Sequence, residues 1–140
     1  MFVDFILTED PPAADAGGRR VDVGRLADGF FVGTLPMICE FGGVIEISFE
    51  NQEAGIFEVE LVGEPVDRDD EDHAIEAWVL ELPPPDPDFP VPRTRVLTFA
   101  AQIGAVDEVE MELAVYIRDQ LDSAAEREWQ ASRFVVVRNL

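Results

Sequence analysis

Residues 108–117 read EVEMELAVYI, and their alternation decides the fold class. The odd-numbered residues from Val109 to Ile117 are all apolar, whereas the even-numbered ones are glutamate, alanine or tyrosine. Successive side chains of a β-strand point to opposite faces, so the pattern indicates a strand with one buried and one exposed face. Glutamate is a poor strand former, so burial of the apolar face must determine this conformation.

Two earlier segments, Val44–Glu50 and Phe57–Leu61, show the same alternation. The intervening residues 51–55, NQEAG, have the glycine and the length of a longer hairpin loop. We therefore predict that the two segments pair as antiparallel neighbours. In that register Glu46 would face Glu60 across the solvent side of the pair.

The remaining strand candidates complete an all-β pattern. Apolar residues on both faces of 95–102 and 132–138 predict central positions in a sheet. Seven or eight strands at hairpin spacing favour a single antiparallel β-sandwich over residues 1–140, Ig-like or jelly-roll-like, with a closed barrel as the alternative. Helical composition is confined to one short turn near residues 122–128. The further strands are predicted at Phe2–Leu7, Arg20–Arg25, Phe30–Val32, Ala74–Leu82, Arg95–Gln102 and Ser132–Arg138.

Two segments interrupt the strand pattern. Residues 9–18, EDPPAADAGG, combine acids, proline, alanine and glycine and predict a mobile loop. Residues 83–92, PPPDPDFPVP, contain six prolines and cannot lie inside a sheet. The second segment fits a stiff connection between two sheets, or a polyproline ligand for an aromatic groove.

Charge narrows the function classes. The chain has 140 residues, 30 acidic and 10 basic side chains and a formal net charge of −20. Such a charge repels nucleic acid and anionic lipid, which argues against direct binding of either. Because 47% of the residues are hydrophobic, the acidity does not predict disorder. The N-terminal MFVDFILTED lacks the basic region of a signal peptide, so we expect a cytoplasmic protein.

Several short features, taken in order, carry a family resemblance. The first half has an early strand with Asp4, a glycine-marked strand at 18–25, the Leu35-Pro36 step and the strand at 44–50. The second half has the proline-rich loop 83–92 and strands at 96–101, 109–117 and 128–138. This order resembles an uncharacterised family of small bacterial domains common in actinobacteria. The resemblance implies an all-β fold and a GC-rich bacterial source, but no activity, because the family has no catalytic motif to carry over. In place of the family's glycine step between its last two strands, this chain has Leu121-Asp122-Ser123-Ala124-Ala125.

The sequence favours a protein that is not an enzyme. Its one histidine, His73, ends the polar run DDEDH at 69–73, where a solvated loop residue is expected. None of the three serines lies in a nucleophile elbow. Cys39, the only cysteine, is expected to be a buried structural thiol. We therefore predict no catalytic and no cofactor-binding residues.

Calcium is the one metal for which the sequence offers candidates. Asp67, Asp69, Asp70 and Asp72 crowd one loop and carry the hard oxygen ligands that Ca²⁺ prefers. Sandwiches of the C2 type bring such loops together at one edge. The run does not follow the EF-hand pattern, however, and solvation of these acids is the simpler interpretation.

Glu46, Glu50, Glu58 and Glu60 are the candidates for an interaction face, since the predicted pair gathers them on its solvent side. Like charges directly opposite destabilise a sheet, so such a face would serve solubility, protection against edge pairing or docking of a basic partner. We predict a protein-interaction or assembly module, able to pair with itself by sheet extension. The alternatives are an acidic nucleic-acid mimic or inhibitor, and a calcium-binding C2-like sandwich.

Overall fold

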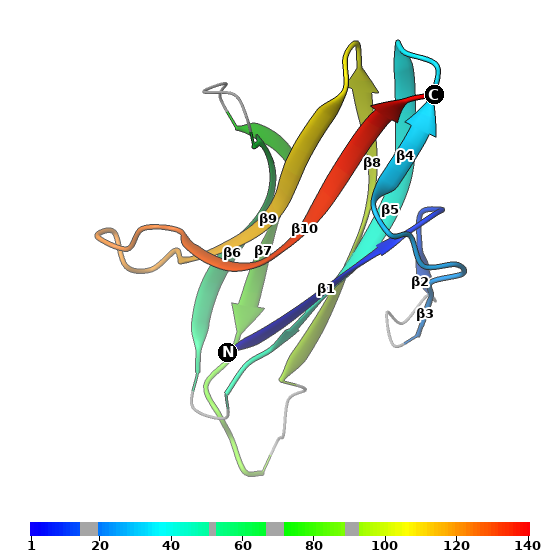
Figure 1. Ribbon diagram of the computed structural model, residues 1–140. Coiled ribbons are helices and arrows are strands. Elements are labelled where there is room, and N and C mark those ends of the chain that lie inside the picture. Colours follow the sequence, from blue (N-terminus) through cyan, green and yellow to red (C-terminus); the bar gives the residue numbers. More distant parts are fainter. Residues whose placement is uncertain (15–19, 51–52, 67–71, 89–92) are drawn as a thin grey trace.

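Ten β-strands make up the regular structure of the computed structural model, which describes residues 1–14, 20–50, 53–66, 72–88 and 93–140. The strands form a three-stranded, a five-stranded and a two-stranded sheet (Figure 1). The predicted all-β fold is confirmed, although there are more strands than the expected seven or eight. None of the described residues is helical.

In place of the one short helical turn that the sequence allows near residues 122–128, the chain forms a non-helical turn. The Asp122 carbonyl accepts a hydrogen bond from the Ala125 amide at 3.1 Å, and the Asp122 side chain accepts one from the Ala124 amide at 3.0 Å. An aspartate that captures nearby amides in this way favours a turn over a helix. The chain then enters the last strand at Glu128.

The three-stranded sheet has the order β1-β5-β8 and is antiparallel throughout. Its strands are β1 (Phe2–Thr8), β5 (Met37–Ser48) and β8 (Thr94–Ala105). The central position predicted for residues 95–102 is wrong, because among the described strands β8 pairs only with β5 and forms an edge of this sheet.

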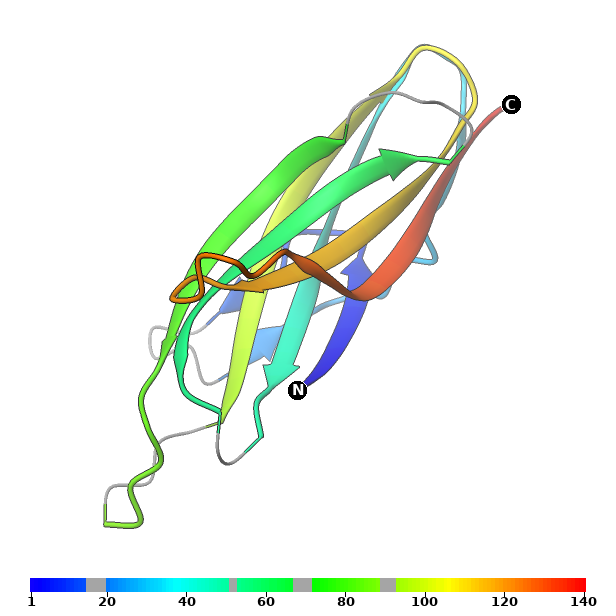
Figure 2. The ribbon, with the colours of Figure 1, turned by 90° about the vertical axis from the view of Figure 1, so that its left-hand side faces the viewer.

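The five-stranded sheet has the order β4-β10-β9-β6-β7 and curls into a half-barrel (Figure 2). β4 runs parallel to β10, and the other pairs are antiparallel. The central position predicted for residues 132–138 is confirmed, since β10 lies between β4 and β9. The strands are β4 (Phe30–Gly33), β6 (Gly55–Pro65), β7 (His73–Leu82), β9 (Val109–Asp119) and β10 (Glu128–Asn139).

A small two-stranded sheet pairs β2 (Ala13–Ala14) with β3 (Val21–Asp22). The strand predicted over residues 20–25 is thus only two residues long, and part of the expected loop 9–18 forms β2. The chain before β2 crosses the outer face of the three-stranded sheet, because a Cβ atom added to Gly42 would lie 2.7 Å from the Pro11 Cα.

The antiparallel pair predicted from residues 44–50 and 57–61 is wrong. The first segment lies in β5 and the second in β6, and these strands belong to different sheets. The connection crosses between the sheets, and the Phe49 and Phe57 rings meet at its ends with centroids 5.1 Å apart. Alternation specifies which side chains are buried, but two buried faces can meet across a core as well as side by side in one sheet.

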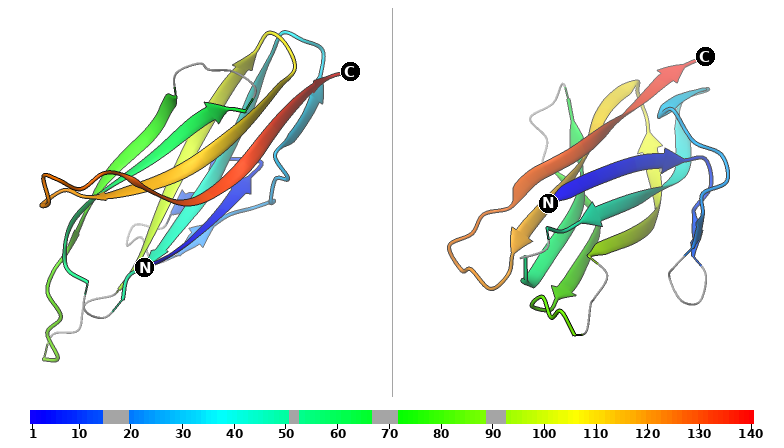
Figure 3. Two further views of the ribbon diagram at one scale, coloured as in Figure 1. Left: turned by 60° about the vertical axis from the view of Figure 1, so that its left-hand side comes forward. Right: turned by 90° about the horizontal axis from the view of Figure 1, so that it is seen from below.

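The core contains buried side chains from both large sheets. Ile45 and Ile47 of β5 are fully buried, as are Leu113 and Val115 of β9 and Val135 of β10. The alternation of residues 109–117 is confirmed in detail, since the odd-numbered side chains are buried or pack against the core. β1 runs alongside β10, so the two large sheets approach each other on that side (Figure 3).

Candidate functional site

The two large sheets have four edge strands, β1, β8, β4 and β7, and their protection differs. An unprotected edge exposes backbone groups that can pair with another chain. The edge of β1 is covered at its C-terminal end, because Thr8 bridges to Leu26 and the Leu7 carbonyl accepts a hydrogen bond from the Ala27 amide at 3.0 Å. β4 has only four residues, which is itself a common form of edge protection.

The β7 edge is long but carries two recognised protective features. Exposed charged side chains, Glu76 and Glu81, lie along it. Its pairing with β6 also shifts register between Leu61 and Val62, which marks a bulge or irregularity. Charge and bulges both discourage a further strand from adding to an edge.

The β8 edge lacks these features. From Val96 to Ala105 it carries ten consecutive uncharged residues, and its register with β5 runs without a shift. Ala100 and Gln102 are exposed on its outer face, while Phe99 and Ala101 are buried on the inner one. From Val96 onward, β8 is therefore a long, regular and uncharged edge in an otherwise acidic protein.

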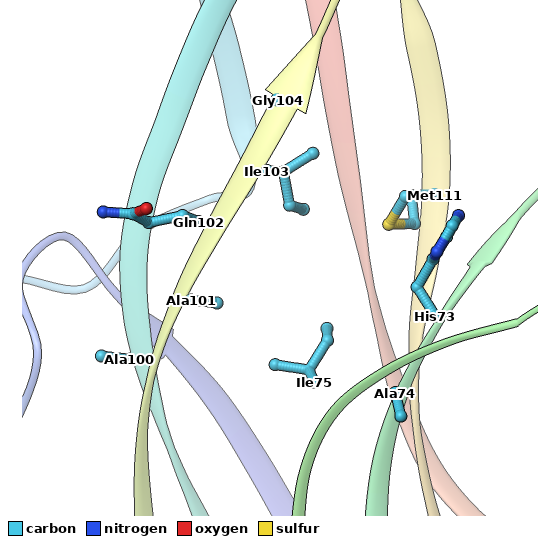
Figure 4. Close-up of a pocket in the computed structure, with 9 residues that line it drawn as sticks. All are labelled: His73, Ala74, Ile75, Ala100, Ala101, Gln102, Ile103, Gly104 and Met111. Atoms are coloured by element: carbon cyan, nitrogen blue, oxygen red, sulfur yellow. The ribbon is translucent and has the colours of Figure 1, made fainter.

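A groove of about 420 Å³ lies between the free edges of β8 and β7 (Figure 4). Ile103 and Ala101 of β8 form one wall, Ile75 and His73 of β7 form the other, and Met111 of β9 lies between them. A smaller cavity of about 170 Å³ shares His73, Ile103 and Met111 and extends the hollow toward the turn after β8. The remaining residues of the larger groove are Ala74, Ala100, Gln102 and Gly104.

The described lining of the groove combines the apolar side chains of Ile75, Ile103 and Met111 with a comparable share of polar surface. Among the described residues that line the groove, His73 is the only titratable one, and the Gln102 side chain donates a hydrogen bond to Glu40 at 2.8 Å. His73 is exposed as expected, but it is the first residue of β7 rather than part of a loop. The inner face of β8 is apolar because Phe99 and Ala101 are buried in the core. Its outer face, with Ala100 and Gln102, is exposed and uncharged.

A polar cluster occupies the outer face of the five-stranded sheet. The Arg127 guanidinium lies 4.3 Å from the centroid of the Tyr116 ring and forms ion pairs with Glu60 at 3.3 Å and Asp72 at 2.8 Å. The Tyr116 hydroxyl donates a hydrogen bond to Glu64. Arg127 precedes β10, so the cluster ties the β9–β10 connection to β6, to β9 and to the residue before β7.

This cluster predicts an unusual titration of Tyr116. The hydrogen bond to Glu64, followed by burial, raises the pKa of Tyr116 from 10.0 to about 12. Tyr116 is the only tyrosine, so ultraviolet absorbance of the phenolate reports on it alone. We expect a midpoint near pH 12 in the native protein and a lower one in the Glu64→Gln variant. An ordinary tyrosine midpoint in the native protein would contradict the hydrogen bond.

The raised pKa of Tyr116 also makes the folding stability depend on pH. The folded-state pKa of Tyr116 exceeds the ordinary tyrosine value of 10.0, so the stabilisation from its protonated hydroxyl is complete below about pH 10. It is lost as the pH rises toward about 12, where the folded protein also releases the proton.

The four glutamates predicted as one interaction face are separated. Glu46 lies on the outer face of the three-stranded sheet, opposite Asp4. Glu50 follows β5 and lies 3.4 Å from the N-terminal ammonium group. Glu58 pairs with Arg118 at 3.0 Å and Glu60 pairs with Arg127, both on the five-stranded sheet. These arginine partners could not be predicted from the sequence pattern, because they lie in segments far along the chain from Glu58 and Glu60.

The calcium candidates fall largely outside the described residues. Asp67, Asp69 and Asp70 lie outside them, and Asp72 is paired with Arg127. Among the residues that the structure does describe, no group of three or more histidine, cysteine, aspartate or glutamate side chains could hold a metal ion.

Cys39 is buried, as predicted. Burial raises the pKa of the Cys39 thiol, which disfavours the reactive thiolate. A structural thiol within the three-stranded sheet is consistent with both observations.

No helix in the described part of the chain is long and apolar enough to cross a membrane. No protein-family model and no curated protein matches the sequence. The resemblance to the actinobacterial family therefore stays a prediction.

Proposed function

We propose that the protein is a binding module, not an enzyme, and that it takes up an extended segment of a protein partner as an added strand on β8. Its scaffold in this proposal is a single β-sandwich that is open between β7 and β8. The observation that carries the proposal is the combination of an uncharged, regular ten-residue edge with a groove directly beside it that Ile75, Ile103 and Met111 help to line. Strand addition of this kind takes affinity from main-chain hydrogen bonds and specificity from pockets for alternate side chains.

The geometry also indicates the chemistry of the partner segment. Alternate side chains of an added strand would point inward, toward Ile75, Ile103 and Met111, and should be apolar. The others would lie on the outer face of the three-stranded sheet, where Glu40 and Glu46 are exposed on the neighbouring strand β5. Basic residues suit those positions, and the net charge of −20 would speed their approach.

The test uses a synthetic peptide of alternating arginine and valine, about as long as β8. We expect saturable binding by calorimetry, and at least about tenfold weaker binding to the Ala100→Lys, Gln102→Lys double variant. Lysines on an edge strand are a natural device against strand addition. Leu121→Lys with Leu140→Lys is the matched control, since it adds the same charge at exposed positions away from β8.

A second peptide separates strand addition from simple charge attraction. It has the same sequence, but alternate backbone amides are methylated on the edge that would face β8, so it keeps its charge and loses its main-chain donors. Equal binding of the two peptides would rule out strand addition. Equal weakening by both lysine pairs would place the interaction somewhere other than β8.

A further inference from the structure

The outer face of the five-stranded sheet carries a row of exposed aromatic rings. Phe30 on β4 is 54% exposed, and Phe134 and Trp129 on β10 are 50% and 54% exposed. The register places Phe30 beside Val136 and Trp129 beside Tyr116, so the row follows β10 along one face. On the opposite face of β10, Val135 and Val137 are fully buried in the core.

Two carboxylates, those of Glu110 and Glu112, lie beside this row. In the register of β9 and β10, Glu112 is directly opposite Phe134 and Glu110 is directly opposite Val136. On its other side Glu112 faces Glu64 of β6, a like-charge arrangement that costs stability in a sheet. Among the described residues, no arginine forms an ion pair with Glu110 or Glu112.

On the same face, one neighbouring ring and carboxylate already bind an arginine side chain of this chain. Tyr116 of β9 and Glu60 of β6 are directly opposite, and Arg127 covers that pair with its guanidinium over the ring and an ion pair to the glutamate. Phe134 and Glu112 repeat this arrangement on the adjoining strands, but without an arginine from the described chain. A planar guanidinium can stack on an aromatic face and pair with a carboxylate at once, which a lysine ammonium does less well.

We infer that this face, defined by Phe30, Trp129 and Phe134 with Glu110 and Glu112, binds an arginine-bearing segment of a protein partner. The guanidinium stacks on Phe134 and pairs with Glu112, while Phe30 and Trp129 contact the flanking backbone and side chains. Exposed aromatic residues of this kind often dominate the energy of a protein interface. The surface is distinct from the β8 edge, because it lies on the other large sheet and faces away from the core.

Trp129 provides a direct readout. The chain has two tryptophans, so the Trp78→Phe variant leaves Trp129 as the only indole. In that background we expect a peptide of alternating glycine and arginine to change the Trp129 fluorescence saturably. A glycine–lysine peptide of equal charge should bind at least about threefold more weakly, because it loses the stacked guanidinium.

Two substitutions and a matched control locate the contact. Phe134→Ser should weaken binding of the arginine peptide by about tenfold, and Glu112→Gln by about threefold. Phe2→Ser removes an aromatic side chain that is 69% exposed on the other sheet and should leave binding unchanged. Thermal melts of all three variants would show whether each is folded.

Several outcomes would overturn the inference. Equal affinity for the arginine and lysine peptides would show that the contact depends on net charge alone and not on a stacked guanidinium. If Phe134→Ser and Phe2→Ser changed the affinity for the arginine peptide equally, the Phe134 ring would not be part of the contact. A response to an uncharged oligosaccharide, with none to the arginine peptide, would make the row a sugar-stacking surface. The Ala100→Lys, Gln102→Lys variant should bind the glycine–arginine peptide normally, so failure here and failure of the β8 proposal are distinguishable.

Discussion

Replacing Gly29 by alanine is expected to destabilise the protein by about 3 kcal/mol. Gly29 has a φ of +80°, which L-residues with a Cβ rarely adopt. A Cβ added there would lie 2.2 Å from the Phe134 carbonyl oxygen, a backbone atom that cannot rotate away. The Gly29 carbonyl also accepts the Val136 amide at 2.8 Å, so the displacement would loosen the start of β4 along β10.

Urea unfolding of variants at two other glycines distinguishes the cost of the positive φ from the cost of the close contact with Phe134. Gly24 has a φ of +58° with no heavy atom within 4 Å of an added Cβ, so Gly24→Ala should cost only the conformational term, about 1 kcal/mol. Gly104 has open space and no positive φ, so Gly104→Ala should stay within about 0.5 kcal/mol of the native protein. If Gly29→Ala costs no more than Gly24→Ala, the close approach to Phe134 is wrong.

Arg93→Met is expected to cost about 2–3 kcal/mol of stability. The Arg93 guanidinium donates hydrogen bonds to three backbone carbonyls, of Glu50 at 2.9 Å, of Pro83 at 3.3 Å and of Glu53. These carbonyls belong to the β5–β6 and β7–β8 connections, so one side chain ties together two of the crossings between the large sheets. Methionine keeps the apolar stem but leaves all three acceptors without their charged donor.

Two variants make this second result specific. Arg93→Lys keeps the charge but replaces the planar fork with one ammonium, so an intermediate loss of about 1–2 kcal/mol is expected. Arg133 is exposed on β10 and donates to the carbonyl of its neighbour Ser132, so Arg133→Met should change stability by less than about 0.5 kcal/mol. Similar unfolding midpoints for Arg93→Met and Arg133→Met would show that Arg93 does not hold the connections together.

Strand identity was predictable along most of the chain. Residues 109–117 alternate so regularly that their buried face follows from the period of two, and β10 has the central position that its two apolar faces indicate. Partner choice was not predictable. The same alternation that predicted an antiparallel pair of residues 44–50 with 57–61 is satisfied by burial against opposite sides of one core.

The candidate sites show the same division. The uncharged run Val96–Ala105 is visible in the sequence, but it becomes an edge only because β5 is its one paired neighbour among the described strands and β7 lies across a groove. The acidic residues are equally visible, yet Glu58 and Glu60 have arginine partners while Glu110 and Glu112 have none among the described residues. Those pairings depend on contacts between residues dozens of positions apart.

By itself, then, the sequence determined the all-β class, most strand positions, the buried state of Cys39 and the net charge of −20, because each depends on local alternation or composition. Only the tertiary structure decided which strands are edges, which face of the five-stranded sheet gathers Phe30, Trp129 and Phe134, and which carboxylates have an arginine beside them. The physical reason is that a strand's own pattern specifies what it buries, whereas its neighbours are chosen by the packing of the whole chain.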